Sequence, residues 1–135
     1  MATALQIDSI GKLVLRLTLG VLLLFHGASK LMNPAGAIER IGTQLVSAGL
    51  PPFFVYGVFI GEVLAPLMII FGLYSRIGAL IVVINMIFAV YLVHLGQLLS
   101  LSKTGGWTLE LQAFYLLVAL ALVFLGSGRI AARPD

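Results

Sequence analysis

Long apolar runs, separated by short polar or glycine- and proline-containing breaks, make up most of this chain. Four of these runs predict membrane-crossing helices, at about residues 11–32, 53–73, 76–97 and 108–125. A helix rises ~1.5 Å per residue, so about 20 apolar residues cross the hydrocarbon layer. We therefore expect an all-α membrane protein, a four-transmembrane-helix bundle that forms a single domain over residues 1–135.

A shorter helix is predicted between the first two spans. Asn33-Pro34 is typical of an N-cap followed by the first helical position, and Pro51-Pro52 prevents continuation. Apolar and polar residues fall on opposite faces: Ile38, Ile41, Gly42, Leu45 and Val46 against Glu39, Arg40, Thr43, Gln44 and Ser47. The segment is too short to span, so we expect an amphipathic helix at the membrane interface or capping the bundle. A structured loop without regular helix is the alternative.

Composition agrees with a membrane location. The chain is 61% hydrophobic and 10% charged, with a mean hydropathy of +1.14, whereas a soluble domain is roughly half apolar and a quarter charged. The absence of cysteine excludes disulfides and thiolate metal sites. The net charge of +3 is too small and dispersed to indicate a nucleic-acid partner.

The basic residues predict an orientation. Lys12, Arg16, Arg76, Arg129 and Arg133 flank the side that holds both termini, and Lys30, Arg40 and Lys103 flank the other. Because cytoplasmic loops carry the excess of Lys and Arg, we expect a multi-pass protein of the cell inner (cytoplasmic) membrane with both termini in the cytoplasm.

The second span carries the most informative polar residue, Glu62, with Pro66 one turn later. A lone carboxylate at the bilayer centre costs at least ~2.5 kcal/mol. Gly57, Gly61 and Ala65 recur at every fourth position, which lets another helix approach closely. We therefore expect Glu62 to face the protein interior and to have a partner.

Counting the rise along each span indicates which polar groups share a depth. From the inner side, Arg16 lies at roughly 8 Å, Glu62 at roughly 17 Å and His26 at roughly 22 Å. His94 and Glu110 lie near the outer boundary, at about 27 Å. Our candidate catalytic residues are Glu62, His26, His94 and Glu110, and our candidate substrate-binding residues are Arg16, Lys30, Trp107 and Asn85; we expect no metal site.

Structural interpretations stand beside these assignments. Arg16 and Glu62 could form a purely structural buried pair, each required by the other. Glu110 could be an acid favoured by the dipole of a helix N-terminus. His94 could be a half-solvated interface residue and Lys30 a snorkelling one. Asn85, with Gln112, could simply hydrogen-bond between helices.

Several short motifs follow one another along the chain: Arg16, Phe25-His26-Gly27-Ala28-Ser29-Lys30-Leu31, Gly61-Glu62-Val63-Leu64-Ala65-Pro66, Gly72-Leu73-Tyr74-Ser75-Arg76-Ile77-Gly78-Ala79, Gly105-Gly106-Trp107 with Glu110, and Gly126-Ser127-Gly128-Arg129. Together they resemble the DoxX family of small four-helix membrane proteins. They cover nearly the whole chain in the family's order. The tail after Arg129 departs from the Ser-Leu-Asp-like ending frequent in the family, which leaves any role of that tail in doubt.

The resemblance implies a subunit or partner of a quinone-linked membrane oxidoreductase, since such proteins are similar to the small membrane subunit of an archaeal thiosulfate:quinone oxidoreductase. His26 or His94 would hydrogen-bond a quinone carbonyl, and Glu62 or Glu110 would relay the proton. No flavin or metal motif is present, so electrons would come from a redox partner protein or a small reductant. A homodimer with a shared site is a further expectation.

Two other functions remain open from the sequence. One is a non-enzymatic membrane scaffold or assembly factor, for which we expect a dry, fully packed core. The other is a small-solute or proton pathway, for which we expect a wet path open to both faces.

Overall fold

The computed structural model describes residues 3–135, and all regular elements within that range are helical. Helix α1 spans Ala4–Met32 and so begins earlier than the predicted residue 11. Thr3 and Gln6 explain the early start, because the Thr3 hydroxyl accepts from Gln6 N at 3.2 Å and the Gln6 side chain accepts from Thr3 N at 2.8 Å. This reciprocal capping box satisfies backbone donors that a helix start leaves free.

The predicted short helix is confirmed as α2, Pro34–Ser47. The Asn33 side chain accepts from Gly36 N at 3.2 Å, and Pro34 occupies the first helical position. Ala37, Ile41 and Leu45 are buried along one face. The loop alternative is therefore wrong.

The two central apolar runs form nearly continuous rods. The first comprises a 3-10 turn Pro52–Phe54, α3 (Val55–Phe59), a π-helical segment Ile60–Leu64 and α4 (Ala65–Phe71); the second comprises α5 (Ser75–Ala89), a π-helical segment Val90–His94 and a 3-10 turn Leu95–Gln97. Both rods, Pro52–Phe71 and Ser75–Gln97, are long and apolar enough to cross a membrane. The last helix, α6 (Glu110–Leu125), is apolar but shorter.

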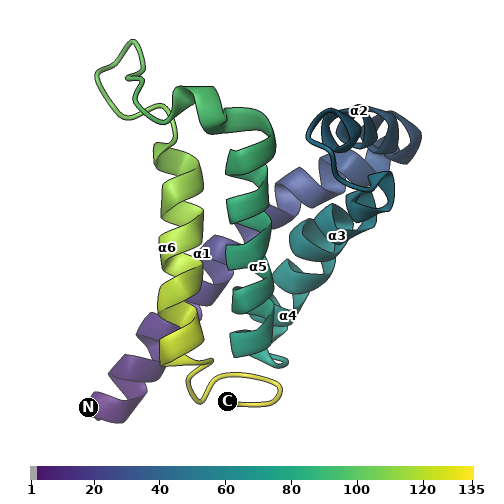
Figure 1. The fold of residues 1–135 in the computed structure, drawn as a ribbon. Helices are drawn as coiled ribbons and strands as arrows, with labels where there is room; N and C mark the ends of the chain where they lie inside the picture. Colours follow the sequence, from purple (N-terminus) through teal and green to yellow (C-terminus); the bar gives the residue numbers. More distant parts are fainter. Residues whose placement is uncertain (1–2) are drawn as a thin grey trace.

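The helices pack side by side around a small apolar core. Helix α5 packs against α6 and α4, while the long α1 crosses α4 and α6 (Figure 1). The core is formed by Leu19, Leu23, Ala65, Ile69, Ala79, Val82, Val83, Met86, Ala119 and Leu122. Many large apolar side chains point outward, among them Phe25, Phe53, Phe71, Phe114 and Phe124. So much exposed apolar surface is typical of a protein whose surroundings are themselves apolar.

The C-terminal segment crosses the end of the assembly where both termini lie (Figure 1). Ala132 N donates to Phe71 O at 2.9 Å, and the Asp135 carboxylate accepts from the backbone N–H groups of Ser127 and Arg76, each at 3.0 Å. The C-terminal segment therefore has a structural role: it closes one end of the helices.

Candidate functional site

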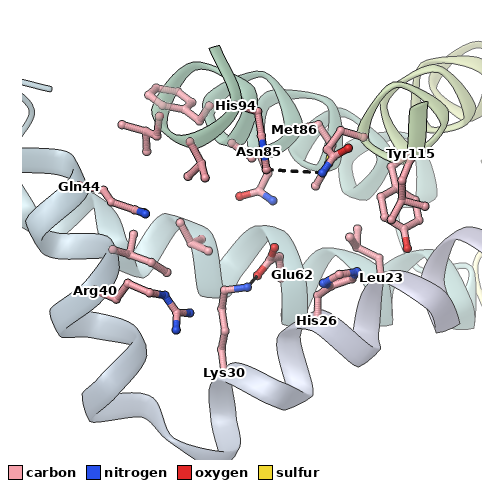
Figure 2. A pocket seen from close by; sticks show the side chains of 18 residues that line it. Leu23, His26, Lys30, Arg40, Gln44, Glu62, Asn85, Met86, His94 and Tyr115 are labelled. Carbon is pink, nitrogen blue, oxygen red and sulfur yellow. Dashed lines mark hydrogen bonds and ion pairs between the residues drawn. The ribbon is translucent and has the colours of Figure 1, made fainter. Parts of the chain in front are cut away.

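A cavity of about 280 Å³ lies among α1, α2, the two π-helical segments, α5 and α6. Figure 2 shows polar side chains from several helices directed at this space. The polar lining residues are His26, Lys30, Arg40, Gln44, Glu62, Asn85, His94, Gln112 and Tyr115. The remaining lining is apolar, so the cavity combines an apolar wall with a few convergent polar groups, as small-molecule sites do.

Lys30 is the partner of Glu62. Lys30 Nζ lies 2.5 Å from Glu62 Oε2, and only 17% and 11% of the two side chains are exposed (Figure 2). This confirms that Glu62 faces inward and has a basic neighbour from another helix. Snorkelling was the alternative interpretation of Lys30. Because its ammonium is held in this ion pair, Lys30 is not a solvated interface lysine.

The structural alternative, a buried pair of Arg16 with Glu62, is wrong. Arg16 is buried, and its guanidinium donates to the carbonyl oxygens of Ile69 at 2.9 Å, Ile70 and Ser127 at 3.0 Å each, and Ile130 at 2.5 Å. Carbonyls at the C-terminal end of α4 lack the regular i+4 hydrogen bond and carry partial negative charge, so they compete for the guanidinium. Arg16 consequently joins α1, α4 and the C-terminal segment and does not line the cavity.

Pro66 explains the backbone that presents Glu62. In a regular helix residue 66 would donate to the carbonyl of Glu62, but proline has no N–H and its ring clashes with that carbonyl. The chain here is π-helical, with Ala65 N donating to Ile60 O. Gly27 of α1 packs against this π-helical turn. The contact needs a glycine, because a Cβ at Gly27 would overlap the Glu62 carbonyl oxygen. Single π-helical turns are frequent at functional sites.

Asn85 places an unpaired amide at the cavity. Its side chain is only 8% exposed, and Nδ2 has no hydrogen-bond partner among the described residues. Gly61 makes room for it, since a Cβ there would lie 2.5 Å from Asn85 Cγ. Leaving a buried donor unpaired costs ~1–3 kcal/mol. The expected interhelical hydrogen bond of Asn85 is therefore not made, and the amide is available to a ligand.

His94 ends the second π-helical segment and is held by two amides. His94 Nδ1 lies 2.8 Å from Gln97 Oε1, and Nε2 lies 3.5 Å from Gln112 Nε2. With the proton on Nδ1, His94 donates to Gln97 and accepts from Gln112, which is the neutral form of the ring. Gln112 Oε1 is buried and lacks a partner in the described part of the chain.

His26 and Tyr115 meet across α1 and α6 at another side of the cavity. Their rings are edge to face, with centroids 6.0 Å apart and planes at 85° (Figure 2). The His26 side chain is exposed as well as lining the cavity. This aromatic pair therefore stands where the cavity approaches the outside of the helices.

Two of the sequence candidates lie away from the cavity. Trp107 donates from Nε1 to Leu98 O at 2.8 Å within the loop before α6. Glu110 is exposed in the first turn of α6, the location that the helix-dipole interpretation describes. The structure thus brings His26, Lys30, Glu62, Asn85 and His94 together and leaves Arg16, Trp107 and Glu110 outside.

Sequence reasoning did not assign four of the polar lining residues to the site: Arg40, Gln44, Gln112 and Tyr115. Arg40 and Gln44 are four apart and flank the buried Ile41, so they border the packed face of α2. That spacing was the available signal. Among residues 3–135, no three His, Asp or Glu side chains are grouped to hold a metal ion.

Comparison with known proteins identifies the family. The DoxX family model matches residues 11–95. A Bacillus subtilis (strain 168) protein named "Putative oxidoreductase CatD" is 30% identical over 125 residues, 93% of this chain and 86% of the relative. A Haemophilus influenzae (strain ATCC 51907 / DSM 11121 / KW20 / Rd) protein named "Uncharacterized protein" is 30% identical over 121 residues, 87% of this chain and 84% of the relative. No solved structure matches. The chain belongs to the DoxX family, a membrane-associated family.

Proposed function

We propose that this protein is a subunit or partner of a quinone-linked membrane oxidoreductase, and that the cavity beside Lys30 and Glu62 receives the quinone headgroup. A redox role is supported by the name of the Bacillus subtilis relative, "Putative oxidoreductase CatD". The observation that carries the proposal is a buried ion pair bordering a cavity in which other polar atoms have no partner.

The cavity suits a small ring bearing oxygen atoms. Its volume of about 280 Å³ lies near the lower end of ligand pockets, which start at roughly 300 Å³. Asn85 Nδ2 is an unpaired donor and Gln112 Oε1 an unpaired acceptor. These two groups match the carbonyl oxygens of a quinone and the hydroxyl groups of its reduced form, because the first accept and the second donate hydrogen bonds.

The residues of the chain would bind the ring and supply protons. A bound quinone would take up electrons and protons at its ring oxygens. Lys30 and Glu62 form the proton-holding pair, while Asn85 orients the ring by donating to one oxygen. His26 and His94 also line the cavity, and their imidazole rings would hydrogen-bond a quinone carbonyl. Electrons would come from a redox partner protein or a small reductant, because the sequence has no flavin, haem or iron–sulfur motif.

In this proposal the protein crosses the cell inner membrane four times, through α1, the rods at 52–71 and 75–97, and α6. Both termini lie at one end of the helices (Figure 1), the end flanked by the larger number of basic residues. The positive-inside rule then places both termini in the cytoplasm. The proposed topology is thus a four-transmembrane-helix bundle.

The structure favours this proposal over the two alternatives. A scaffold needs no cavity lined by unpaired buried amides, whereas Asn85 and Gln112 both leave such groups. A pathway needs an opening at both faces, whereas Arg16 and the C-terminal segment fill the end near the termini.

Quinone retention tests the proposal. Protein reconstituted in nanodiscs that contain a native-length quinone is repurified in detergent, and its lipid extract is analysed for quinone. We expect retention by the unaltered protein and a roughly 10-fold or greater loss in Glu62→Gln, because without the carboxylate the Lys30 ammonium, which can donate to a quinone oxygen, is no longer held at the cavity. Glu39→Gln on the exposed face of α2 is the control that should retain quinone.

Asn85→Ala is a second variant, needed in case Glu62→Gln fails to fold. It removes an amide donor that has no partner in the described part of the protein, so it should not disturb folding. It should lower retention while leaving thermal unfolding nearly unchanged. Absence of quinone from the folded, unaltered protein would contradict the proposal.

A further inference from the structure

The charges that line the cavity do not balance. Its lining includes two basic side chains, Lys30 and Arg40, against one carboxylate, Glu62. Lys30 is answered by Glu62, but no carboxylate within residues 3–135 lies within ion-pair distance of Arg40. A neutral quinone would provide no counter-ion for this positive charge. The imbalance therefore points to a second, negatively charged occupant.

Arg40 is placed to meet such an occupant. Arg40 is an exposed residue that projects from α2 toward the same space as the Lys30 ammonium (Figure 2). Its guanidinium forms no hydrogen bond to any described residue, so it is accessible to an anion from outside the protein. The Lys30 ammonium has three donor hydrogens and only one carboxylate oxygen beside it, so it retains unused donors. Gln44, one turn from Arg40, lines the same wall.

The chemistry of these groups selects an oxyanion. A planar guanidinium presents paired donors that match two oxygens of a phosphate or carboxylate, and an ammonium adds a point charge. The nine-tenths-buried Asn85 amide, with Nδ2 unpartnered, supplies a separate uncharged donor in the same cavity. The lining thus has more unused donors than acceptors, which suits a ligand rich in oxygen acceptors.

We infer that the α2 wall of the cavity is an oxyanion subsite, with Arg40 as its principal ligand and Lys30 and Gln44 beside it. Its occupant is a phosphate-type oxyanion, either on the headgroup of an acidic lipid or free in solution. The subsite does not depend on the quinone proposal, because the unanswered charge of Arg40 exists whatever else occupies the cavity.

Binding measurements with two probes test the inference and separate the two sources. In one arm, the protein is placed in nanodiscs of phosphatidylcholine with a minor fraction of phosphatidylglycerol, and lipids retained after detergent extraction are counted by native mass spectrometry. In the other arm, inorganic phosphate is titrated into protein in pure phosphatidylcholine nanodiscs at fixed ionic strength, and the shift of the unfolding temperature is measured.

Arg40→Gln is compared with Lys103→Gln, which removes the same charge from the exposed loop before α6. We expect Arg40→Gln to weaken retention or the apparent phosphate affinity by about 10-fold or more, and Lys103→Gln to leave both unchanged. Loss in the phosphatidylglycerol arm identifies a lipid headgroup, and loss in the phosphate arm identifies a free anion.

Two results overturn the inference. One is the absence of selective retention and of any phosphate shift in the unaltered protein. The other is an equal loss in Arg40→Gln and Lys103→Gln, because that result would indicate general attraction to a basic surface rather than a site.

Discussion

Lys30 Nζ and Glu62 Oε2 lie 2.5 Å apart between the end of α1 and the π-helical turn that precedes α4. The ion pair joins α1 to the π-helical turn, and Gly27 allows these two segments to lie in close contact. It also borders the cavity, so a single interaction both fixes the helices and presents charge to a ligand. The two roles predict different effects for the two partners.

Lys30→Met should destabilise the protein more than Glu62→Gln. The first substitution leaves a carboxylate of only 11% exposure without its cation, for which a loss of about 3 kcal/mol is expected. The second leaves a lysine whose long side chain can turn toward the interface. Thermal unfolding in detergent should show this order, and the double variant should regain stability relative to Lys30→Met. Losses in the double variant that equal the sum of the two single losses would argue against the pairing.

Arg16→Lys should loosen the C-terminal segment without altering the cavity. A lysine cannot span the carbonyl oxygens of Ile69, Ser127 and Ile130 as the guanidinium fork does. We expect a loss of about 2 kcal/mol or more in unfolding free energy and faster digestion by carboxypeptidase. The control, Arg129→Lys, changes an exposed side chain and should do neither.

Gly27→Ala should disturb the site while Gly57→Ala should not. A methyl group at Gly27 overlaps the Glu62 carbonyl, so α1 must move away from the π-helical turn. Gly57 has no neighbouring atom within 4 Å of a Cβ. Quinone retention and thermal stability should both fall in Gly27→Ala and remain near the unaltered values in Gly57→Ala. A fall in both variants would mean that the outward face of α3 is also packed, against another copy or another protein.

The proposed topology can be read by cysteine labelling, because the chain has no cysteine of its own. Lys103→Cys in the loop before α6 should react with a membrane-impermeant maleimide in spheroplasts. Ala132→Cys in the exposed tail should react only after the membrane is permeabilised. The reverse pattern would place the termini outside.

The helices could be predicted from the sequence with useful accuracy. Apolar runs at 53–73, 76–97 and 108–125 correspond to helices at 52–71, 75–97 and 110–125. The Asn33-Pro34 signal placed the start of α2. These features succeed because they depend on local chemistry, which the sequence states directly.

The site could be predicted only in part. Counting residues gives the depth of a side chain along a span but not the direction in which it points, so Glu62 was placed correctly and its partner was not. Arg16 had a strong competing set of acceptors in carbonyls near the end of α4 and in the C-terminal segment, 53 to 114 residues away in the chain. The π-helical turns also escaped prediction, although Pro66 one turn after Glu62 signalled an interrupted backbone.

Photolabelling with an azido-quinone tests the central claim most directly. Protein in nanodiscs is irradiated with the probe, digested, and the labelled peptides are identified by mass spectrometry. If the headgroup lies beside Lys30 and Glu62, label will concentrate in the lining segments 26–30, 58–62, 85–94 and 111–115. Labelling will fall when unlabelled quinone competes with the probe, and also in the Glu62→Gln variant. Label spread over the outward apolar surface, unchanged by either treatment, would contradict the account.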